Sequence, residues 1–181
     1  MRLKTLFVFV ACLVLFSGCS IFGMLDQKLN SGSIKGDEFI INKIEIDGKT
    51  YVAPQVLAKL AKEELQKPEK DREKIQDSES SLEDLAEIDG VATLNFISKD
   101  SRIAGSSGCG SYFASYRWTN TKTINITPGG QTRKICNPSD VMRFDFRFMR
   151  ALEGDFIVKQ YKNDDLVMSG KSMKIYLKPN K

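Results

Sequence analysis

The chain has 181 residues, a net charge of +4 and no histidine. The length suits one domain. The missing histidine excludes Ser-His and Cys-His nucleophile pairs and most zinc and iron sites, so we expect no enzyme, no metal and no cofactor. A Ser-Lys pair or a carboxylate pair remains the weaker, catalytic alternative. No stretch interleaves basic and aromatic residues in a nucleic-acid-binding pattern, and we expect no nucleic-acid partner.

The first 18 residues have the layout of a signal peptide, with a basic start and an uncharged apolar run over 6–16. That run is shorter than the roughly 20 residues that span a bilayer. The following Ser-Gly-Cys, ending at Cys19, resembles a bacterial lipobox, which implies acylation of Cys19. Ser20 beside it implies sorting to the outer membrane, facing the periplasm. We expect residues 19–38 to be a lipidated N-terminus and tether, with an ordinary signal peptide as the alternative.

The cysteine count agrees with export. Cys12 leaves with the signal peptide and Cys19 carries the lipid, so Cys109 and Cys136 remain as a pair. In an oxidising periplasm this pair can form a disulfide, and two buried thiols are the alternative. A bridge closing a loop of about 27 residues stabilises a fold by roughly 3–4 kcal/mol in the chain-entropy model.

The first part of the domain combines a strand with helices. Residues 39–46 alternate apolar and polar side chains and end in an Asp-Gly turn, which predicts a strand. Apolar residues at helical spacing predict a helix over 54–65 and a shorter one over 82–88, which Ser81 can cap. We interpret about 49–89 as a helical insertion at the surface.

Strand signals return after Gly90 and follow one another closely. Short alternating segments separated by tight turns predict an antiparallel sheet with strong curvature. The predicted strands lie around residues 94–96, 112–118, 124–126, 156–161, 166–169 and 173–177.

A helix is predicted over 138–153, with Asn137 as its N-cap and Gly154 after its last turn. Its apolar arc covers more than half of the circumference, which is wider than one sheet face needs. One explanation is that the helix lies deep in a half-barrel or is covered by the inserted helix. The other is a groove that receives an apolar ligand or partner segment. The groove would be lined by Met142, Phe146 and Met149.

Asp145 falls inside this apolar arc, where a carboxylate needs a hydrogen-bond donor. We expect it to brace the strand around Arg133. The glycine-rich segment 102–110 is followed by a strand instead of a helix N-terminus. We therefore interpret the segment as a structural turn and not as a phosphate loop.

Three motifs in this order resemble the META domain of HslJ-like heat-shock-associated proteins. The first is a glycine-rich turn, the second a Thr-x-x-x-Cys segment, and the third a helix with an acidic residue three positions before Phe. Gly110 stands where the family has Asn. The resemblance runs from about Ile41 to the end, interrupted by the insertion. The matching residues are Arg102, Gly105, Gly108 and Cys109 in the turn, Thr132 and Cys136 in the segment, and Asp145, Phe148 and Leu152 in the helix.

The resemblance implies an α+β fold for residues 39–181, a curved antiparallel β-sheet (partial barrel) around one main α-helix. It implies no established catalytic activity, and a role in envelope stress or virulence. We therefore expect a non-catalytic envelope lipoprotein that binds another envelope component and contributes to stress tolerance or virulence. The alternative is a pilotin-like lipoprotein that binds a partner segment or lipid in an apolar groove, because some members of the family resemble such proteins.

Overall fold

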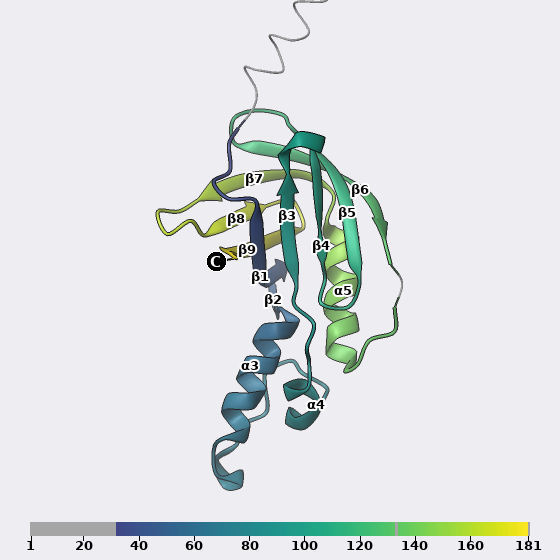
Figure 1. The fold of residues 1–181 in the computed structure, drawn as a ribbon. Helices are drawn as coiled ribbons and strands as arrows, with labels where there is room; N and C mark the ends of the chain where they lie inside the picture. Colours follow the sequence, from purple (N-terminus) through teal and green to yellow (C-terminus); the bar gives the residue numbers. More distant parts are fainter. Residues whose placement is uncertain (1–31, 133, 181) are drawn as a thin grey trace, which may run out of the picture.

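The computed structural model describes residues 32–132 and 134–180. Within these residues nine strands form one antiparallel sheet, and three α-helices accompany it (Figure 1). The strands are β1 (Glu38–Ile46), β2 (Lys49–Val52), β3 (Thr93–Ile97), β4 (Arg102–Ser106), β5 (Ser111–Trp118), β6 (Thr123–Gln131), β7 (Gly154–Gln160), β8 (Leu166–Ser169) and β9 (Met173–Pro179). The α-helices are α3 (Pro54–Leu65), α4 (Leu82–Ala86) and α5 (Ser139–Ala151).

The sheet closes on itself because its first strand pairs with its last. Along one edge, β1 lies antiparallel to β9. Its other edge is shared between β3, which pairs with the N-terminal part of β1, and β2, which pairs with the C-terminal part. The eight strands other than β2 therefore form a closed barrel, which corrects the expected partial barrel. Closure pairs the backbone N–H and C=O groups that the edge strands of an open sheet leave unpaired.

The barrel interior is filled by side chains that alternate with exposed ones along each strand. In β5, for example, Tyr112, Ala114 and Tyr116 are buried and their neighbours are exposed. Phe144, Phe148 and Leu152 from the region of α5 join the same core. The expectation of an antiparallel sheet packed around one main helix is therefore confirmed in its broad form.

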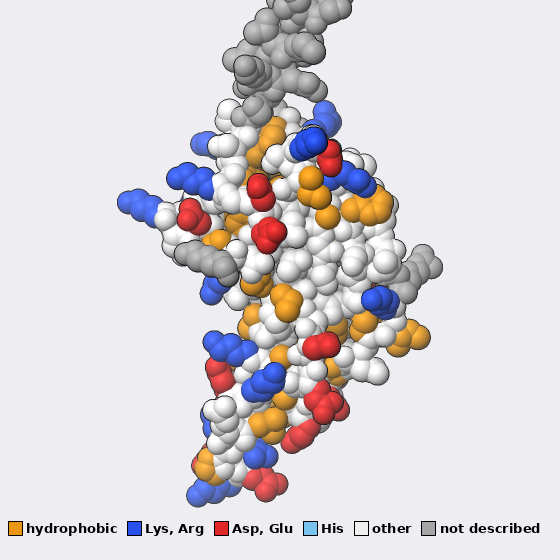
Figure 2. Space-filling view, viewed as in Figure 1, with side chains coloured by type: hydrophobic (Ala, Val, Ile, Leu, Met, Phe, Trp, Pro, Cys, Tyr) orange, Lys and Arg blue, Asp and Glu red, His pale blue; other side chains and the backbone are white. Residues whose placement is uncertain are grey.

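Helices α3 and α4 form a second, smaller core at one end of the barrel, where they extend away from it (Figure 1). Charged side chains of both signs gather on this extension (Figure 2). Ser81 caps α4 by accepting a hydrogen bond from the Asp84 N–H at 3.1 Å, as predicted. The small core consists of Leu57, Ala58, Ala61, Leu85, Ile88 and Val141 of α5.

Four features differ from the sequence prediction. Lys49–Val52 forms β2, so the expected helical insertion begins with a strand that completes a hairpin with β1. Helix α5 starts at Ser139 with no side-chain cap, so Asn137 is not its N-cap. The helix ends at Ala151, and Gly154, with φ of 86°, begins β7. Arg102–Ser106 is a strand, which leaves a shorter turn than the glycine-rich segment suggested.

The predicted signal peptide and the acylation site Cys19 lie outside the described residues. In the part of the chain that the structure describes, none of the helices has the length and apolar character needed to cross a bilayer.

Candidate functional site

The glycine-rich turn between β4 and β5 is organised by the hydroxyl of Ser107. Its Oγ accepts hydrogen bonds from the N–H groups of Gly110 at 3.2 Å and Cys109 at 3.4 Å. Ser107 is only 1% exposed. Gly108 has φ of 88°, a left-handed conformation that favours glycine. The interpretation of the segment as a structural turn agrees with these contacts.

Gly105 and Gly110 are needed for close approach. A Cβ on Gly105 would lie 2.2 Å from the carbonyl oxygen of Thr93 on β3, and one on Gly110 would lie 2.6 Å from that of Thr132. The Asn that the family has at position 110 therefore does not fit this arrangement without a shift of the neighbouring backbone. In this chain the contacts across the turn come from Ser107.

The carboxylate of Asp145 on α5 accepts a hydrogen bond from the Ser107 hydroxyl. The donor that this carboxylate was expected to need is therefore in the turn. Arg133, which Asp145 was expected to brace, is outside the described residues. The bond joins two of the family motifs, since one residue lies in the turn and the other on the helix.

The Thr-x-x-x-Cys segment is attached to the same turn. Cys109 and Cys136 form a disulfide with a Cα–Cα distance of 5.7 Å, so the paired arrangement is the one present. Thr132 Oγ1 accepts a hydrogen bond from the Ser111 N–H at 2.9 Å. The three motifs, far apart in the sequence, therefore meet at one end of the barrel.

Tyr112 and Phe148 connect the place where the three motifs meet, here called the junction, to the barrel core. Their ring centroids lie 5.2 Å apart in an edge-to-face arrangement. The Tyr112 hydroxyl donates to the carbonyl oxygen of Thr93 at 2.8 Å, and burial raises the pKa of this phenol. The tyrosine is therefore neutral and held in place at physiological pH. The Ser107–Asp145 and Tyr112–Phe148 contacts link the β4–β5 region to α5, and the remaining contacts link the turn and strands to one another. The motifs therefore have a structural role.

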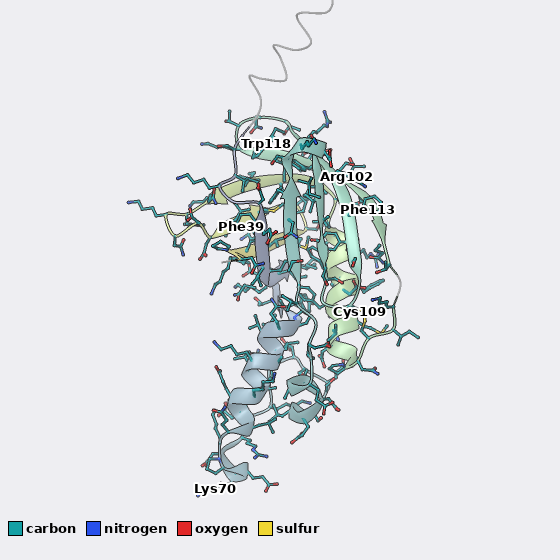
Figure 3. The ribbon with its side chains drawn as sticks, viewed as in Figure 1. Phe39, Lys70, Arg102, Cys109, Phe113 and Trp118 are labelled. Carbon is teal, nitrogen blue, oxygen red and sulfur yellow. A yellow bond between two sulfur atoms is a disulfide. The ribbon has the colours of Figure 1, made fainter. Side chains whose placement is uncertain are left out.

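Arg102 is the motif residue that stands apart. It lies at the opposite end of β4 from the turn, far from Cys109 (Figure 3). Its guanidinium is 4.9 Å from the ring centroid of Phe113 on β5. Both side chains lie on the outer side of the barrel, since Arg102 and Phe113 are exposed while their neighbours Ile103 and Tyr112 are buried.

The second apolar stripe of α5 is only partly covered. Phe146 is 63% exposed and Met142 is 42% exposed, while the inserted helices contact Val141 on another side. An open groove of about 350 Å³ runs between α5 and residues 128–131 of β6, and Phe146 and Met149 line it. Met142 is not among its lining residues. The first apolar stripe lies in the barrel core, but the explanation that the inserted helix covers the second stripe is wrong for Met142 and Phe146.

The groove exists because β6 changes neighbours along its length. β7 pairs with β6 only along Thr123–Ile126. Residues 128–131 pair with β5 on one side, but on the other side they lie beside α5 instead of β7. The helix and this part of β6 do not close against each other. Gln131, Asp145 and Arg150 provide the polar side chains at this groove.

Asp140, which the sequence analysis did not single out, links α5 to the insertion. Its carboxylate accepts from the Ser80 N–H at 3.1 Å and from the Ser78 hydroxyl at 3.3 Å, and pairs with Arg143 at 3.1 Å. Burial raises the pKa of Asp140, but hydrogen bonds from Ser80 and Glu79 and the charge of Arg143 outweigh it and hold the pKa below its usual value. Asp140 therefore stays charged.

Among residues 32–132 and 134–180, histidine, cysteine, aspartate and glutamate form no group of three or more that could hold a metal ion.

Comparisons with known proteins agree with this geometry. An NMR structure of a protein from Burkholderia xenovorans has a similar fold, with a TM-score of 0.51, 14% identity and 85% of each chain covered. No curated protein matches the chain significantly. The family model described as the META domain matches residues 75–179, beginning inside the expected insertion instead of near Ile41. Since this match covers more than half of the sequence, the chain belongs to the META domain family.

Proposed function

We propose that this chain is a non-catalytic envelope lipoprotein that binds another envelope component and contributes to stress tolerance or virulence. Three features support the proposal. The lipobox-like sequence ending at Cys19 implies a lipid anchor in the outer membrane, facing the periplasm. The Cys109–Cys136 disulfide is typical of proteins outside the cytosol. Family membership implies an envelope role by resemblance.

The partly uncovered stripe of α5 is the observation that carries the binding function. A helix whose opposite face fills the barrel core nevertheless leaves Phe146 mostly exposed, beside a groove with apolar walls. Exposed apolar surface of this kind is typical of protein interaction sites. Aromatic and Met side chains are also enriched in such interfaces.

The absence of histidine from the sequence supports the non-catalytic part of the proposal. Ser107 is a hydroxyl that pairs with a carboxylate at the motif turn, and it is buried and already bonded within the turn. Its contacts serve to hold the turn against α5.

Crosslinking in cells tests the binding function. A photo-crosslinking amino acid at position 146 is expected to give a discrete adduct with one envelope component. Ile157, which is 58% exposed on β7, is the matched control position and is expected to give no such adduct. The proposal is wrong if position 146 gives no adduct, or if both positions give the same set.

The groove favours a second candidate, a pilotin-like lipoprotein that holds a partner segment or a lipid. The groove's volume of about 350 Å³ lies at the small end of the range of about 300–1,000 Å³ for small-molecule sites. Phe146→Asp is expected to abolish binding while the protein stays folded. Native mass spectrometry separates the two occupants, because a lipid adds its own mass to the purified protein. Retained binding by the folded variant would rule out this candidate.

A further inference from the structure

A small cavity lies between α5, β2 and the loop that precedes α4. Its volume is about 50 Å³, and it is separate from the groove at Phe146. Residues from all three elements line it, so it exists only because the insertion folds back against the barrel. The lining residues that matter most are Thr50, Tyr51, Ser78, Asp140, Arg143 and Arg147.

Arg147, which lines this cavity, has one side-chain donor without an acceptor. Its guanidinium stacks over the ring of Tyr51, with 4.2 Å between the guanidinium carbon and the ring centroid. Stacking uses the face of the guanidinium but not its N–H groups, which point outward in its plane. Nη1 is buried and has no hydrogen-bond partner, and no other buried side-chain nitrogen or oxygen in the described residues is in this state. Buried donors are nearly always paired, so the Arg147 guanidinium has hydrogen-bonding capacity that the described residues do not use.

Two of the acidic groups nearby, Asp140 and Glu79, are paired with Arg143. Its Nη2 lies 3.1 Å from Asp140 and 2.9 Å from Glu79, and Asp140 also accepts hydrogen bonds from the loop. Arg147 forms no ion pair among the described residues. Asp77 also lines the cavity, but its carboxylate lies beyond ion-pair distance of Arg147. The charge of Arg143 is therefore compensated and that of Arg147 is not.

We propose that this cavity binds a small oxyanion, a carboxylate or a phosphate group, on Arg147. Water would supply an acceptor but no charge, whereas an oxyanion supplies both, and a guanidinium matches its geometry with two parallel N–H groups. A cavity needs about 10–15 Å³ for each water-sized group, so about 50 Å³ holds a few such groups, the size of one carboxylate or phosphate. Thr50 and Gln76 at the cavity add further polar side chains.

This site is independent of the proposed function and of the family motifs. Thr50, Tyr51 and Leu57, which form one wall, precede the residues that match the META domain. The anion could be a free ion or the carboxyl end of a peptide, since both present the same chemistry to Arg147.

NMR titration of the isotope-labelled full-length chain in detergent tests the proposal. The probes are sodium acetate, inorganic phosphate, a trialanine peptide with a free carboxyl end and the same peptide amidated, with sodium chloride at equal ionic strength as reference. We expect saturable shifts of the Arg147 Nε–Hε signal and of the Thr50 and Ser78 amides. Binding of the peptide acid but not the amide identifies a carboxyl end as the source. Binding of acetate or phosphate alone identifies a free anion.

Two variants and a control complete the test. Arg147→Gln is expected to weaken binding at least about ten-fold, because it removes a charge-assisted hydrogen bond. Thr50→Phe obstructs the cavity from an exposed strand position and is expected to have a similar effect, which covers the case that Arg147→Gln does not fold. Arg117→Gln, at an exposed position of β5 outside both the cavity and the groove, should leave the affinity unchanged. The proposal is overturned if no probe gives saturable shifts, if chloride reproduces them, or if the folded variants bind as well as the unmodified chain.

Discussion

Replacing Ser107 by alanine removes the hydroxyl that ties the glycine-rich turn to α5. The change deletes the hydrogen bond to the Asp145 carboxylate and leaves two N–H groups, those of Cys109 and Gly110, without this acceptor. A hydrogen bond to a charged group contributes about 1.5–3 kcal/mol, and buried groups left unpaired add to the loss. We expect Ser107→Ala to lower the free energy of unfolding by about 2–4 kcal/mol.

Urea unfolding of the full-length chain, followed through the fluorescence of the single tryptophan, measures this loss. Ser115→Ala is the matched control, because Ser115 lies on the exposed side of β5 and its replacement should change the stability by less than about 0.5 kcal/mol. The double variant with Asp145→Asn should lose less than the sum of the two single variants, since both interrupt one contact. A Ser107→Ala loss as small as that of the control would refute the role assigned to this hydroxyl.

Three further predictions concern α5 and its surroundings. Phe146→Asp should change the free energy of unfolding by less than about 0.5 kcal/mol, whereas the fully buried Phe148→Ala should cost about 3–5 kcal/mol in the same assay. Reducing the Cys109–Cys136 bridge should cost about 3–4 kcal/mol, because it releases a loop closed over 27 residues. Asp140 has a lowered pKa when folded, so it stabilises the fold at neutral pH. This contribution to the free energy of unfolding is lost as the pH falls below about 4. In the Asp140→Asn variant, the free energy of unfolding should therefore fall less between neutral and acidic pH than it does in the unmodified chain.

Local patterns predicted most of the strands because side-chain alternation is a local property of a half-buried sheet. The segment Leu166–Ser169 agrees with its prediction at both ends. Strand β4 was missed because its alternation is obscured by small residues, among them Gly105. The glycine is explained by its close approach to the carbonyl oxygen of Thr93, which leaves no room for a Cβ.

Closure of the barrel could not be predicted from local patterns. It depends on pairing β1 with β9, whose residues are separated by most of the domain. Alternation shows that a strand has one buried face, but it does not show which strand lies at its edge. The partial barrel was therefore the most that the alternation supported.

The candidate site, like the fold, could be predicted only in part from local sequence patterns. The cysteine count identified Cys109 and Cys136 as a pair, and the apolar arc of the helix indicated that Asp145 needs a donor. The identity of that donor, Ser107, depends on how the turn meets α5 in space. Asp140 and Arg147 were missed because, in the sequence, they look like polar residues on a helix surface, and their roles arise from the folded insertion.

The central claim, that this chain is an envelope lipoprotein, depends most directly on Cys19. Metabolic labelling with a clickable palmitate analogue, followed by membrane fractionation, should label the unmodified protein and place it in the outer membrane. Cys19→Ala should abolish both the label and the membrane association, and Cys12→Ala is the matched control that should change neither. Palmitate labelling that survives Cys19→Ala would contradict the account.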